Sequence, residues 1–436
     1  MNLLEKISNK TAKIGVIGLG YVGLPLAVEK AKAGYEVLGF DIQEDKVEKV
    51  NDGINYIGDV VNEELEEIVK NKKLSATSDY DRIKECDAVM ICVPTPLDKF
   101  KQPDLTYVEM STKEVSKRLH KEMLIVLEST TYPGTTEEVM LPLLERDDLK
   151  VGIDFYLAFS PERVDPGNIS YKTKNTPKVV GGVTSKCTEH AKVLYENVLD
   201  ANVFTVSSPK EAEMSKILEN SFRIVNIAFI NEMAIVAKKM GINIWEVIDA
   251  AATKPFGFMP FYPGPGVGGH CIPIDPFYLT YKARAYDYHT RLIELAGEIN
   301  DFMPEYVVER LMDEMNKQKK CLNGAKVLIV GVAYKNDIDD LRESPALKVI
   351  ENLENKYADI KVTDPYIDTF MLKGKEYKTV KLTKELIENS DAIIITTGHK
   401  HNVDYDLILK NSKIIFDTKN VLKEKREKYS EKIILL

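Results

Sequence analysis

The sequence lacks an excess of positive charge: 59 lysines and arginines stand against 68 aspartates and glutamates, for a formal net charge of −9. A protein that binds DNA or RNA needs a basic face, so this balance argues against a nucleic-acid partner. It does not exclude a small anionic ligand, because a few cations and a helix N-terminus are enough to hold one.

Long apolar segments are also missing. No apolar run reaches the length of a membrane-spanning helix, and the N-terminal stretch MNLLEKISNK lacks the apolar region of a signal peptide. We therefore expect a protein with no membrane partner.

Cysteines are few, and their spacing is wide. An odd count of five, with no CxxC pair and no Cys/His metal pattern, favours reduced thiols and a cytoplasmic location. His399 and His401 are close in sequence, but no further ligands accompany them, so we predict no metal site. The cysteines are Cys86, Cys92, Cys187, Cys271 and Cys321.

The chain has 436 residues, of which 44% are hydrophobic and 29% charged, as is ordinary for a globular protein with two or three domains. Alternating strand and helix patterns occupy both ends of the chain, and helical patterns occupy the middle. We place the boundaries so that residues 1–206, 207–316 and 317–436 form three domains.

A glycine motif lies near the N-terminus. Gly18, Gly20 and Gly23 form GxGxxG between an apolar run and a helical pattern, and a second apolar run ends at Asp41. This context predicts a dinucleotide site, with the pyrophosphate on the helix N-terminus and the acid on a ribose hydroxyl. A carboxylate there repels a 2′-phosphate, which favours NAD over NADP.

Polar turns follow three further predicted strands. Thr95 lies in the first turn and Thr130 in the second, and both are candidate cofactor contacts, although simple turn chemistry explains hydroxyls there equally well. The third turn, SPERVDPGN from Ser160, carries charges of both signs, and Glu162 is its candidate functional carboxylate.

A long helix is predicted from Ser208 to Lys239, with a capping-box pattern at its start and Gly241 beyond its end. Lys216, Asn220 and Arg223 share one face of it. Much of the helix is otherwise apolar, which is typical of a buried helix or a subunit interface, where such polar groups need partners. The alternative is a solvated polar stripe.

The stretch from Pro255 to Leu279 packs five glycines and six prolines around Cys271. Its composition disfavours helix and strand and suits a loop that brings backbone close to a ligand. Gly268 and Gly269 would let a substrate approach the sulfur, and Asp275 lies four residues beyond it. The alternative is a surface loop with an incidental buried cysteine.

The C-terminal end repeats the α/β pattern without the glycine motif. The apolar run KVLIVG ends at Gly331 and is followed by Val332-Ala333-Tyr334-Lys335. We therefore expect this half not to bind a second dinucleotide in the same way, but to suit another nucleotide-like ligand.

Several of these segments together resemble the UDP-glucose/GDP-mannose dehydrogenase superfamily. The matching segments run in order along nearly the whole chain. They are GLGYVGLPLA from Gly18, VPTP from Val93, ESTTYPGTT from Glu128, SPERVDPGN from Ser160, EMSKILENSFRIVNIAFINE from Glu213, PGVGGHCIPIDP from Pro265 and GVAYKNDIDDLRESPA from Gly331.

The resemblance implies an α/β fold with two Rossmann-like, doubly wound parallel-sheet domains joined by a mainly helical domain that dimerises through the long helix. It also implies NAD-dependent oxidation of the C6 alcohol of a UDP-sugar to a carboxylate, with two NAD consumed per sugar. The product would be a precursor of a surface polysaccharide.

The resemblance also assigns roles to residues. Cys271 would capture the aldehyde as a thiohemiacetal and then a thioester, Lys216 would stabilise oxyanions with Asn220 as its partner, and Asp275 and Glu162 would handle protons or water. Cofactor contacts are implied at Gly18, Gly20, Tyr21, Val22, Gly23, Asp41, Thr95 and Thr130. Substrate contacts are implied at Arg163, Arg223, Gly268, Lys335 and Arg342.

One departure bears on the substrate. Members that act on UDP-glucose carry a second glutamate where this chain has Asp165 and Pro166. The PERxxPGN and GGHCIPIDP forms resemble the branch that acts on UDP-N-acetylhexosamines, so UDP-N-acetylglucosamine is our first expectation and UDP-N-acetylmannosamine the second. A non-catalytic NAD or nucleotide-sugar sensor is a remote alternative, because binding alone needs no thiol nucleophile.

Overall fold

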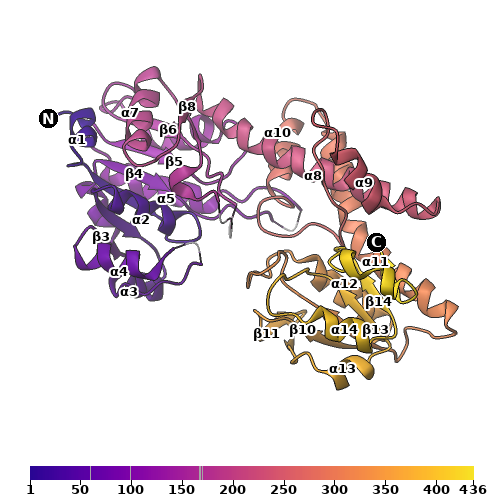
Figure 1. Ribbon diagram of the computed structural model, residues 1–436. Coiled ribbons are helices and arrows are strands. Elements are labelled where there is room, and N and C mark those ends of the chain that lie inside the picture. Colours follow the sequence, from indigo (N-terminus) through magenta and orange to yellow (C-terminus); the bar gives the residue numbers. More distant parts are fainter. Residues whose placement is uncertain (59, 99, 166–167, 169) are drawn as a thin grey trace. The chain divides into compact units, whose positions relative to one another are not determined.

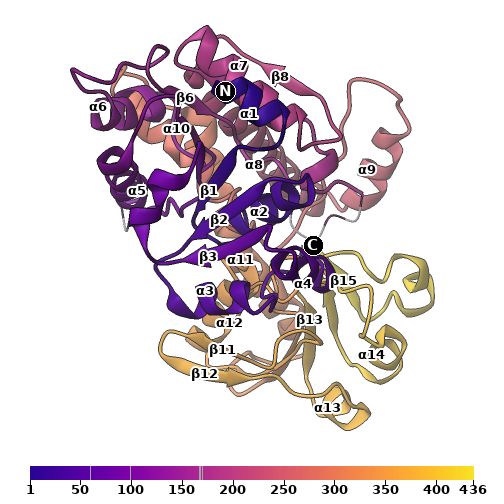
Figure 2. The same cartoon turned by 90° about the vertical axis from the view of Figure 1, so that its left-hand side faces the viewer.

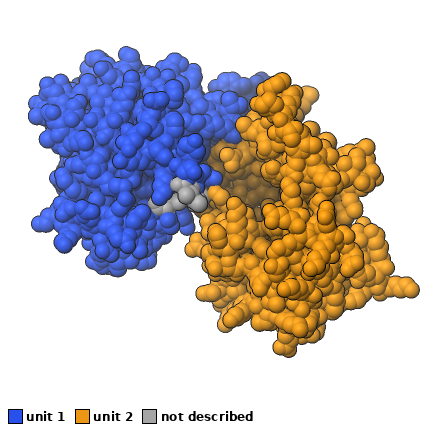
Figure 3. All heavy atoms as spheres, in the orientation of Figure 1, with its two compact units in different colours: residues 1–219, 277–288 blue, residues 220–276, 289–436 orange. Residues whose placement is uncertain are grey.

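The computed structural model describes residues 1–58, 60–98, 100–165, 168 and 170–436 (Figure 1). The chain divides into two compact units, coloured separately in Figure 3. The first comprises Met1–Glu219 with Phe277–Tyr288, and the second comprises Asn220–Pro276 with His289–Leu436.

An eight-stranded sheet forms the centre of the first unit, with strand order β3-β2-β1-β4-β5-β6-β7-β8. Every neighbouring pair is parallel except β6 and β7. The strands are β1 (Lys13–Ile17), β2 (Glu36–Phe40), β3 (Leu74–Thr77), β4 (Ala88–Ile91), β5 (Leu124–Leu127), β6 (Tyr156–Phe159), β7 (Lys178–Gly182) and β8 (Val203–Thr205).

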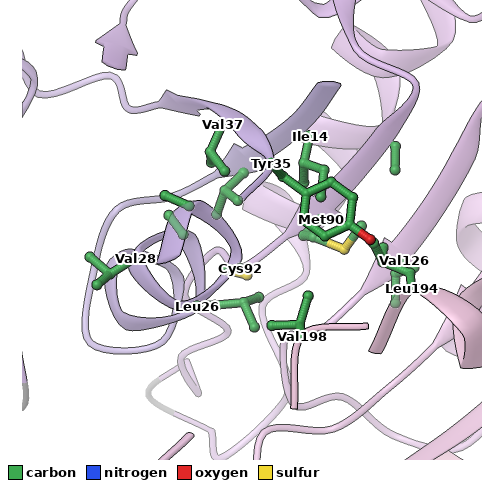
Figure 4. Close-up of a cluster of buried hydrophobic side chains, with 14 of the residues drawn as sticks. Ile14, Leu26, Val28, Tyr35, Val37, Met90, Cys92, Val126, Leu194 and Val198 are labelled. Atoms are coloured by element: carbon green, nitrogen blue, oxygen red, sulfur yellow. The ribbon is translucent and has the colours of Figure 1, made fainter. Parts of the chain in front are cut away.

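Helices cover both faces of this sheet. Alternate residues of β4 point to opposite sides, so Met90 lies in one core with α2 and α7 (Figure 4), and Val89 lies in another with α5. The helices α2, α5 and α7 are labelled in Figure 2. The helices are α1 (Leu3–Ser8), α2 (Gly23–Lys32), α3 (Glu44–Asn51), α4 (Asn62–Lys70), α5 (Thr106–Arg118), α6 (Leu141–Leu144) and α7 (Ser185–Glu196). Short helical turns add Tyr80–Glu85, Thr136–Met140 and Thr173–Asn175.

Four helices occupy the middle of the sequence. They are α8 (Pro209–Lys239), α9 (Ile244–Ala252), α10 (Asp275–Arg284) and α11 (Arg291–Lys317). The predicted long helix is confirmed, and Gly241 follows its end with φ +72°. At its start, Ser208 Oγ accepts the Lys210 N–H and donates to the Glu211 carboxylate.

The second unit contains a five-stranded parallel sheet with the order β10-β9-β13-β14-β15. Its strands are β9 (Lys326–Val330), β10 (Asp359–Thr363), β13 (Ala392–Ile395), β14 (Ile415–Asp417) and β15 (Ile433–Leu435). The unit is completed by a two-stranded hairpin, three helices and two short helical turns. They are the hairpin of β11 (Thr369–Leu372) and β12 (Lys375–Lys378), the helices α12 (Pro345–Asn355), α13 (Lys384–Glu388) and α14 (Tyr405–Asn411), and the turns Lys423–Lys425 and Glu427–Tyr429.

This sheet is also covered on both faces. Ile329 packs in a core with α11 and α12, whereas Leu328 packs in another with α13 and α14. The predicted fold class, two doubly wound α/β sheets with helices between them in sequence, is confirmed. The hairpin and the antiparallel pairing of β7 were not predicted. No helix of the described residues is long and apolar enough to span a membrane.

Candidate active site

The turn between β1 and α2 is closed by its glycines. A Cβ on Gly18 would lie 2.6 Å from the Cys92 carbonyl oxygen, and one on Gly23 would lie 1.8 Å from the Gly18 oxygen. Gly20, in contrast, faces open space. Gly23 also begins α2, so the turn presents accessible backbone beside a helix N-terminus, which fits the pyrophosphate of a dinucleotide.

Asp41 follows β2 and supports this turn. Its Oδ2 accepts the Leu19 N–H at 2.9 Å, which holds the carboxylate beside the glycine turn. The predicted contacts Tyr21 and Val22 lie in the same turn, Tyr21 exposed and Val22 half-buried. Tyr56 was not predicted, yet its hydroxyl donates to the Leu19 carbonyl at 2.7 Å.

The two candidate threonines are joined directly. Thr95 Oγ1 donates to the Thr130 carbonyl oxygen at 2.7 Å and thereby links the segments after β4 and β5, which are neighbours in the sheet. Tyr278 of α10 donates its hydroxyl hydrogen to the Thr95 carbonyl. The hydroxyl of Thr95 therefore links two loops.

Glu162 is held as a carboxylate. Its Oε1 accepts the N–H groups of Arg163 and Val164 at 2.7 and 2.8 Å, and Lys178 Nζ lies 3.3 Å from its Oε2. Burial alone would raise the pKa of Glu162, but the Lys178 charge and the two amides outweigh it, so the pKa lies below its ordinary value. Lys216 lowers it further.

Lys178 was not predicted. This lysine on β7 is buried, and its Nζ also lies 2.6 Å from Glu128 Oε2, while Tyr195 donates its hydroxyl hydrogen to the other Glu128 oxygen. The adjacent carboxylates raise the pKa of Lys178 against the effect of its burial. A lysine placed between two acids is charged, and it fixes the segment that carries Glu162.

The rest of the polar loop is partly described. The guanidinium of Arg163, a predicted substrate contact, pairs with Glu219 at 2.6 Å and donates to the Pro177 carbonyl at 3.0 Å. Asp165 is exposed, and Pro166 lies outside the described residues.

Glu213, on the first turns of α8, is a second residue that was not predicted. Its buried carboxylate accepts the Gly134 N–H, the Thr136 N–H at 2.9 Å and the Thr136 hydroxyl at 2.7 Å. Burial raises the pKa of Glu213 to about 7, although these hydrogen bonds act against the rise. The contact ties α8 to the segment that begins at Glu128.

The predicted polar face of α8 is mostly buried. Lys216 is 8% exposed and Asn220 is 7% exposed, so these two residues do not belong to a solvated stripe. Arg223 is exposed, one turn further along the same face. A buried lysine and a buried amide on successive turns need polar partners.

Asn220 has such a partner. Its Nδ2 donates to Asp275 Oδ2 at 2.6 Å, and both side chains are buried. Asp275 is the first residue of α10, and its N–H donates to the Cys271 carbonyl at 2.8 Å. Cys271 itself is exposed rather than buried, at the entrance to a helix whose dipole favours negative charge.

The loop around Cys271 is anchored by backbone contacts. The Gly264 N–H donates to Asn231 Oδ1 at 2.9 Å, and the Gly269 N–H donates to the Arg342 carbonyl at 2.9 Å. A Cβ on Gly268 would lie 2.7 Å from Tyr334 Cβ. Glycine at 268 therefore permits close packing against Tyr334, which differs from the open approach to the sulfur that we expected.

Cationic residues follow two strands of the second sheet, β9 and β14. Lys335 follows β9, and Arg342 further along pairs with Asp340 at 2.6 Å. Lys419 was not predicted, although it lies two residues after the end of β14; a Cβ on Gly264 would lie 2.9 Å from its Nζ. Burial lowers the pKa of Lys419 to about 8, against the effect of Asp417.

His399 lies in the same region and is fully buried, with hydrogen-bonding partners at both ring nitrogens. Among the described residues, no group of three or more His, Cys, Asp or Glu side chains could hold a metal ion.

Three family models match the chain. Residues 12–199 match the NAD binding domain of the UDP-glucose/GDP-mannose dehydrogenase family, residues 210–302 its central domain and residues 328–424 its UDP binding domain. The glycine turn and Asp41 lie within the first range, and Cys271 lies within the second.

Curated proteins are similar over almost their full length. UDP-N-acetyl-D-glucosamine 6-dehydrogenase of Salmonella typhi is 36% identical over 94% of this chain and 96% of its own. UDP-N-acetyl-D-mannosamine dehydrogenase of Pyrococcus horikoshii is 37% identical over the same shares. The solved structure of UDP-D-ManNAc dehydrogenase from Pyrococcus horikoshii matches with a TM-score of 0.86 at 36% identity, over 94% of this chain and 96% of that one.

Proposed function

Because the chain belongs to the UDP-glucose/GDP-mannose dehydrogenase family, we propose that it oxidises C6 of a UDP-N-acetylhexosamine to the carboxylate. The family is one of NAD-dependent nucleotide-sugar dehydrogenases, and the chain carries its NAD and UDP binding domains. UDP-N-acetylglucosamine is our first choice of substrate and UDP-N-acetylmannosamine the alternative, followed by UDP-glucose.

The exposed residue Cys271 carries this proposal. It stands at the entrance to α10, in a loop whose backbone is fixed at Gly264 and Gly269. A cysteine on an exposed and anchored loop suits a covalent intermediate, whereas an NAD or nucleotide-sugar sensor has no need of a thiol nucleophile.

The reaction passes through a thioester on Cys271. NAD, which the glycine turn and Asp41 would hold, would supply the hydride acceptor for the two oxidations, one of the C6 alcohol and one of the thiohemiacetal. Between them the Cys271 thiolate adds to the aldehyde carbon, which forms the thiohemiacetal and holds the reactive aldehyde on the enzyme. Water then attacks the thioester, releases the carboxylate and returns the thiol.

The polar residues around this chemistry have distinct tasks. Lys216 stabilises the negative oxygen that develops in the tetrahedral species, with Asn220 as hydrogen-bonding partner. Asp275, held by Asn220, and Glu162, held as a carboxylate by Lys178, receive protons or orient water.

Each nucleotide has candidate contacts. The turn of Gly18, Gly20, Tyr21, Val22 and Gly23 holds the pyrophosphate of NAD, and Asp41 holds its adenosine ribose; Thr95 and Thr130 line the same edge of the sheet. Lys335 and Arg342, with Arg163, Arg223 and Gly268, serve the UDP-sugar, and Lys419 adds a cation.

A homodimer forms through α8 in this proposal. Phe222, Phe229 and Val236 are exposed at intervals of seven residues, so they form one apolar stripe along the helix. A second copy of the chain would bury this stripe by a two-fold, self-complementary contact.

A cytoplasmic location follows from the chemistry. The cysteines are not in disulfides in the described structure, and a thiol nucleophile stays active only where it is kept reduced. The product is an N-acetylhexosaminuronic acid precursor of a surface polysaccharide.

The test is NADH formation with UDP-N-acetylglucosamine, UDP-N-acetylmannosamine, UDP-N-acetylgalactosamine, UDP-glucose and GDP-mannose, with NADH counted per sugar consumed. We expect two NADH per sugar and the highest kcat/KM with UDP-N-acetylglucosamine. One NADH per sugar would contradict the thioester scheme. No NADH with any of the five sugars would favour the sensor.

A further inference from the structure

The strand order of the C-terminal sheet reverses between β9 and β13, because β10 lies on one side of β9 and β13 on the other. Ligands of open parallel sheets bind outside the carboxyl ends of the strands at such a reversal. The loop after β9 carries Lys335, and the loop after β13 carries His399. These two loops therefore flank the position where the nucleotide sugar is expected.

His399 connects its own loop, through its two ring nitrogens, to the loop after β9 and to the end of β10. The backbone N–H of Asp337 donates to Nδ1 at 2.9 Å, and Nε2 lies 3.1 Å from Asp364 Oδ2. An amide N–H only donates, so Nδ1 carries no hydrogen and Nε2–H must be the donor to Asp364. One fully buried ring thus connects the loop after β9 with the carboxylate at the end of β10.

Further bonds between the same loops surround His399. The Asn336 side-chain oxygen accepts the Gly398 N–H at 3.1 Å, and Asp337 Oδ1 accepts the Lys400 N–H at 2.9 Å. These contacts lie on both sides of His399 and adjoin Lys335 in sequence. The position of the Lys335 backbone therefore depends on how the loop after β13 is held.

Asp364 and Asp41 occupy equivalent places in the two sheets. Asp41 follows β2 and accepts the Leu19 N–H, whereas Asp364 follows β10 and accepts the Val332 N–H at 2.7 Å. In the NAD binding domain this acid is the expected partner of a ribose hydroxyl. In the C-terminal sheet the corresponding carboxylate already accepts Nε2–H of His399. The His399 imidazole thus binds Asp364 where a ligand hydroxyl would otherwise bind, and Asp364 serves to hold the loops in place.

We propose that His399 is a positioning residue for substrate binding: it holds the loop Gly331–Asp337 in the conformation that presents Lys335 to the diphosphate of the nucleotide sugar. The inference rests on the proposed function, which places that diphosphate beside Lys335.

The test measures UDP binding to the full-length protein by calorimetry, for the wild type, His399→Ala, His399→Gln and His399→Asn. We expect UDP to bind about tenfold or more weakly to His399→Ala, because the loss of two buried hydrogen bonds releases the loop. His399→Asn can still accept the Asp337 N–H and should keep more affinity than His399→Gln, which can reach only Asp364. The affinity for NAD should not change.

Two controls separate positioning from stability. His401→Gln alters an exposed neighbouring histidine and should leave UDP binding unchanged. Lys335→Met as a single substitution should weaken UDP binding strongly. Added to His399→Ala, the same substitution should weaken UDP binding much less, because a lysine that is no longer positioned contributes little to UDP affinity. A purely structural role would lower Tm in the His399 variants while UDP affinity, measured well below Tm, stayed the same.

A lower Tm of the His399 variants without any change in UDP affinity would overturn the inference. If Lys335→Met still weakened UDP binding, the substrate assignment would remain intact. If neither Lys335→Met nor the His399 variants changed UDP affinity, the nucleotide would bind elsewhere, and the assignment of Lys335 in the proposed function would fall together with the inference.

Discussion

Asn220 and Asp275 form a buried pair in which the amide Nδ2 donates to the carboxylate Oδ2 at 2.6 Å. The pair joins the long helix α8 to the first residue of α10, four residues beyond Cys271. A neutral amide supplies the hydrogen without adding a second charge, and the bond holds the Asp275 carboxyl group in one orientation.

Replacement of this amide by an acid tests its role. Asn220→Asp would set two carboxylates in contact, and one of them would have to bind a proton at neutral pH. We expect kcat to fall about 10- to 100-fold at pH 8 and to recover partly as the pH is lowered, in steady-state assays. Asn226→Asp is the matched control, because Asn226 lies on the same helix and its side chain donates to the Phe222 carbonyl of that helix. Equal effects of both substitutions would contradict the assignment.

Replacement of the nucleophile should separate the two oxidations. Cys271→Ser would leave an alcohol that cannot support the thioester, so steady turnover should be lost and no more than about one NADH per site should form in a rapid-mixing experiment. Cys321→Ser removes the other exposed cysteine and should keep normal turnover. Turnover of Cys271→Ser at the wild-type rate would exclude the covalent mechanism.

The charge of Lys178 should be visible in the pH dependence of the reaction. Lys178 helps to keep the pKa of Glu162 low, so the double variant Lys178→Met/Glu128→Gln should raise that pKa without leaving Glu128 as an unpaired buried charge. The step that needs the Glu162 carboxylate would then lose rate at a higher pH than in the wild type. The measurement is kcat against pH, and Lys178→Arg should partly restore the wild-type profile. An unchanged acid limb would show that Lys178 does not act through Glu162.

Glu213 should make stability depend on pH in a defined direction. Its folded-state pKa of about 7 lies above the ordinary value of 4.5, so its stabilising effect is complete below pH 4.5 and is lost as pH rises toward 7. Relative to Glu213→Gln, the wild type should lose up to about 3 kcal/mol of unfolding free energy across this range.

Tm measured against pH for the wild type and this variant checks the prediction. Glu211→Gln on the same helix is the control. The pKa of Glu211 is lowered by its hydrogen bond to Ser208, so its contribution changes only near and below pH 4.5. A wild-type Tm that fell relative to that of Glu213→Gln as the pH was lowered from 7 to 4.5 would contradict the prediction.

The apolar stripe on α8 predicts the effect of a surface charge on assembly. Phe229 is 55% exposed at the middle of the stripe, and a glutamate there would have to be desolvated in a dimer. Phe229→Glu should therefore halve the mass found by light scattering. Met371→Glu on the exposed hairpin strand β11 should leave the mass unchanged. A dimer that survives Phe229→Glu would place the interface elsewhere.

Local patterns were enough to predict much of the fold. The glycines at 18, 20 and 23 and the acid at 41 act over short stretches of backbone, and the helical pattern after Pro209 persists for 31 residues. The β11–β12 hairpin was missed because its strands, TFML and KEYK, are short and mostly polar. The antiparallel direction of β7 depends on a partner strand that the local pattern does not specify.

Residues of the candidate site could be proposed from the sequence where a pattern within a few neighbouring residues pointed to them. Cys271 and Asp275 lie within one turn of each other, and the loop composition around them is unusual. Lys178 and Glu213 were missed because each is a single charged residue in an ordinary element, and their partners lie 50 and 77 residues away in sequence.

The amino-acid sequence alone determined that there are two α/β halves, one with a dinucleotide turn, and a thiol in a glycine- and proline-rich loop. These features depend on residue periodicity and on backbone freedom within a few positions. The tertiary structure decided which charges are paired: Glu162 with Lys178, Asp275 with Asn220, and Asp364 with His399. Such pairings depend on which elements pack together, and burial then makes each unpaired alternative too costly.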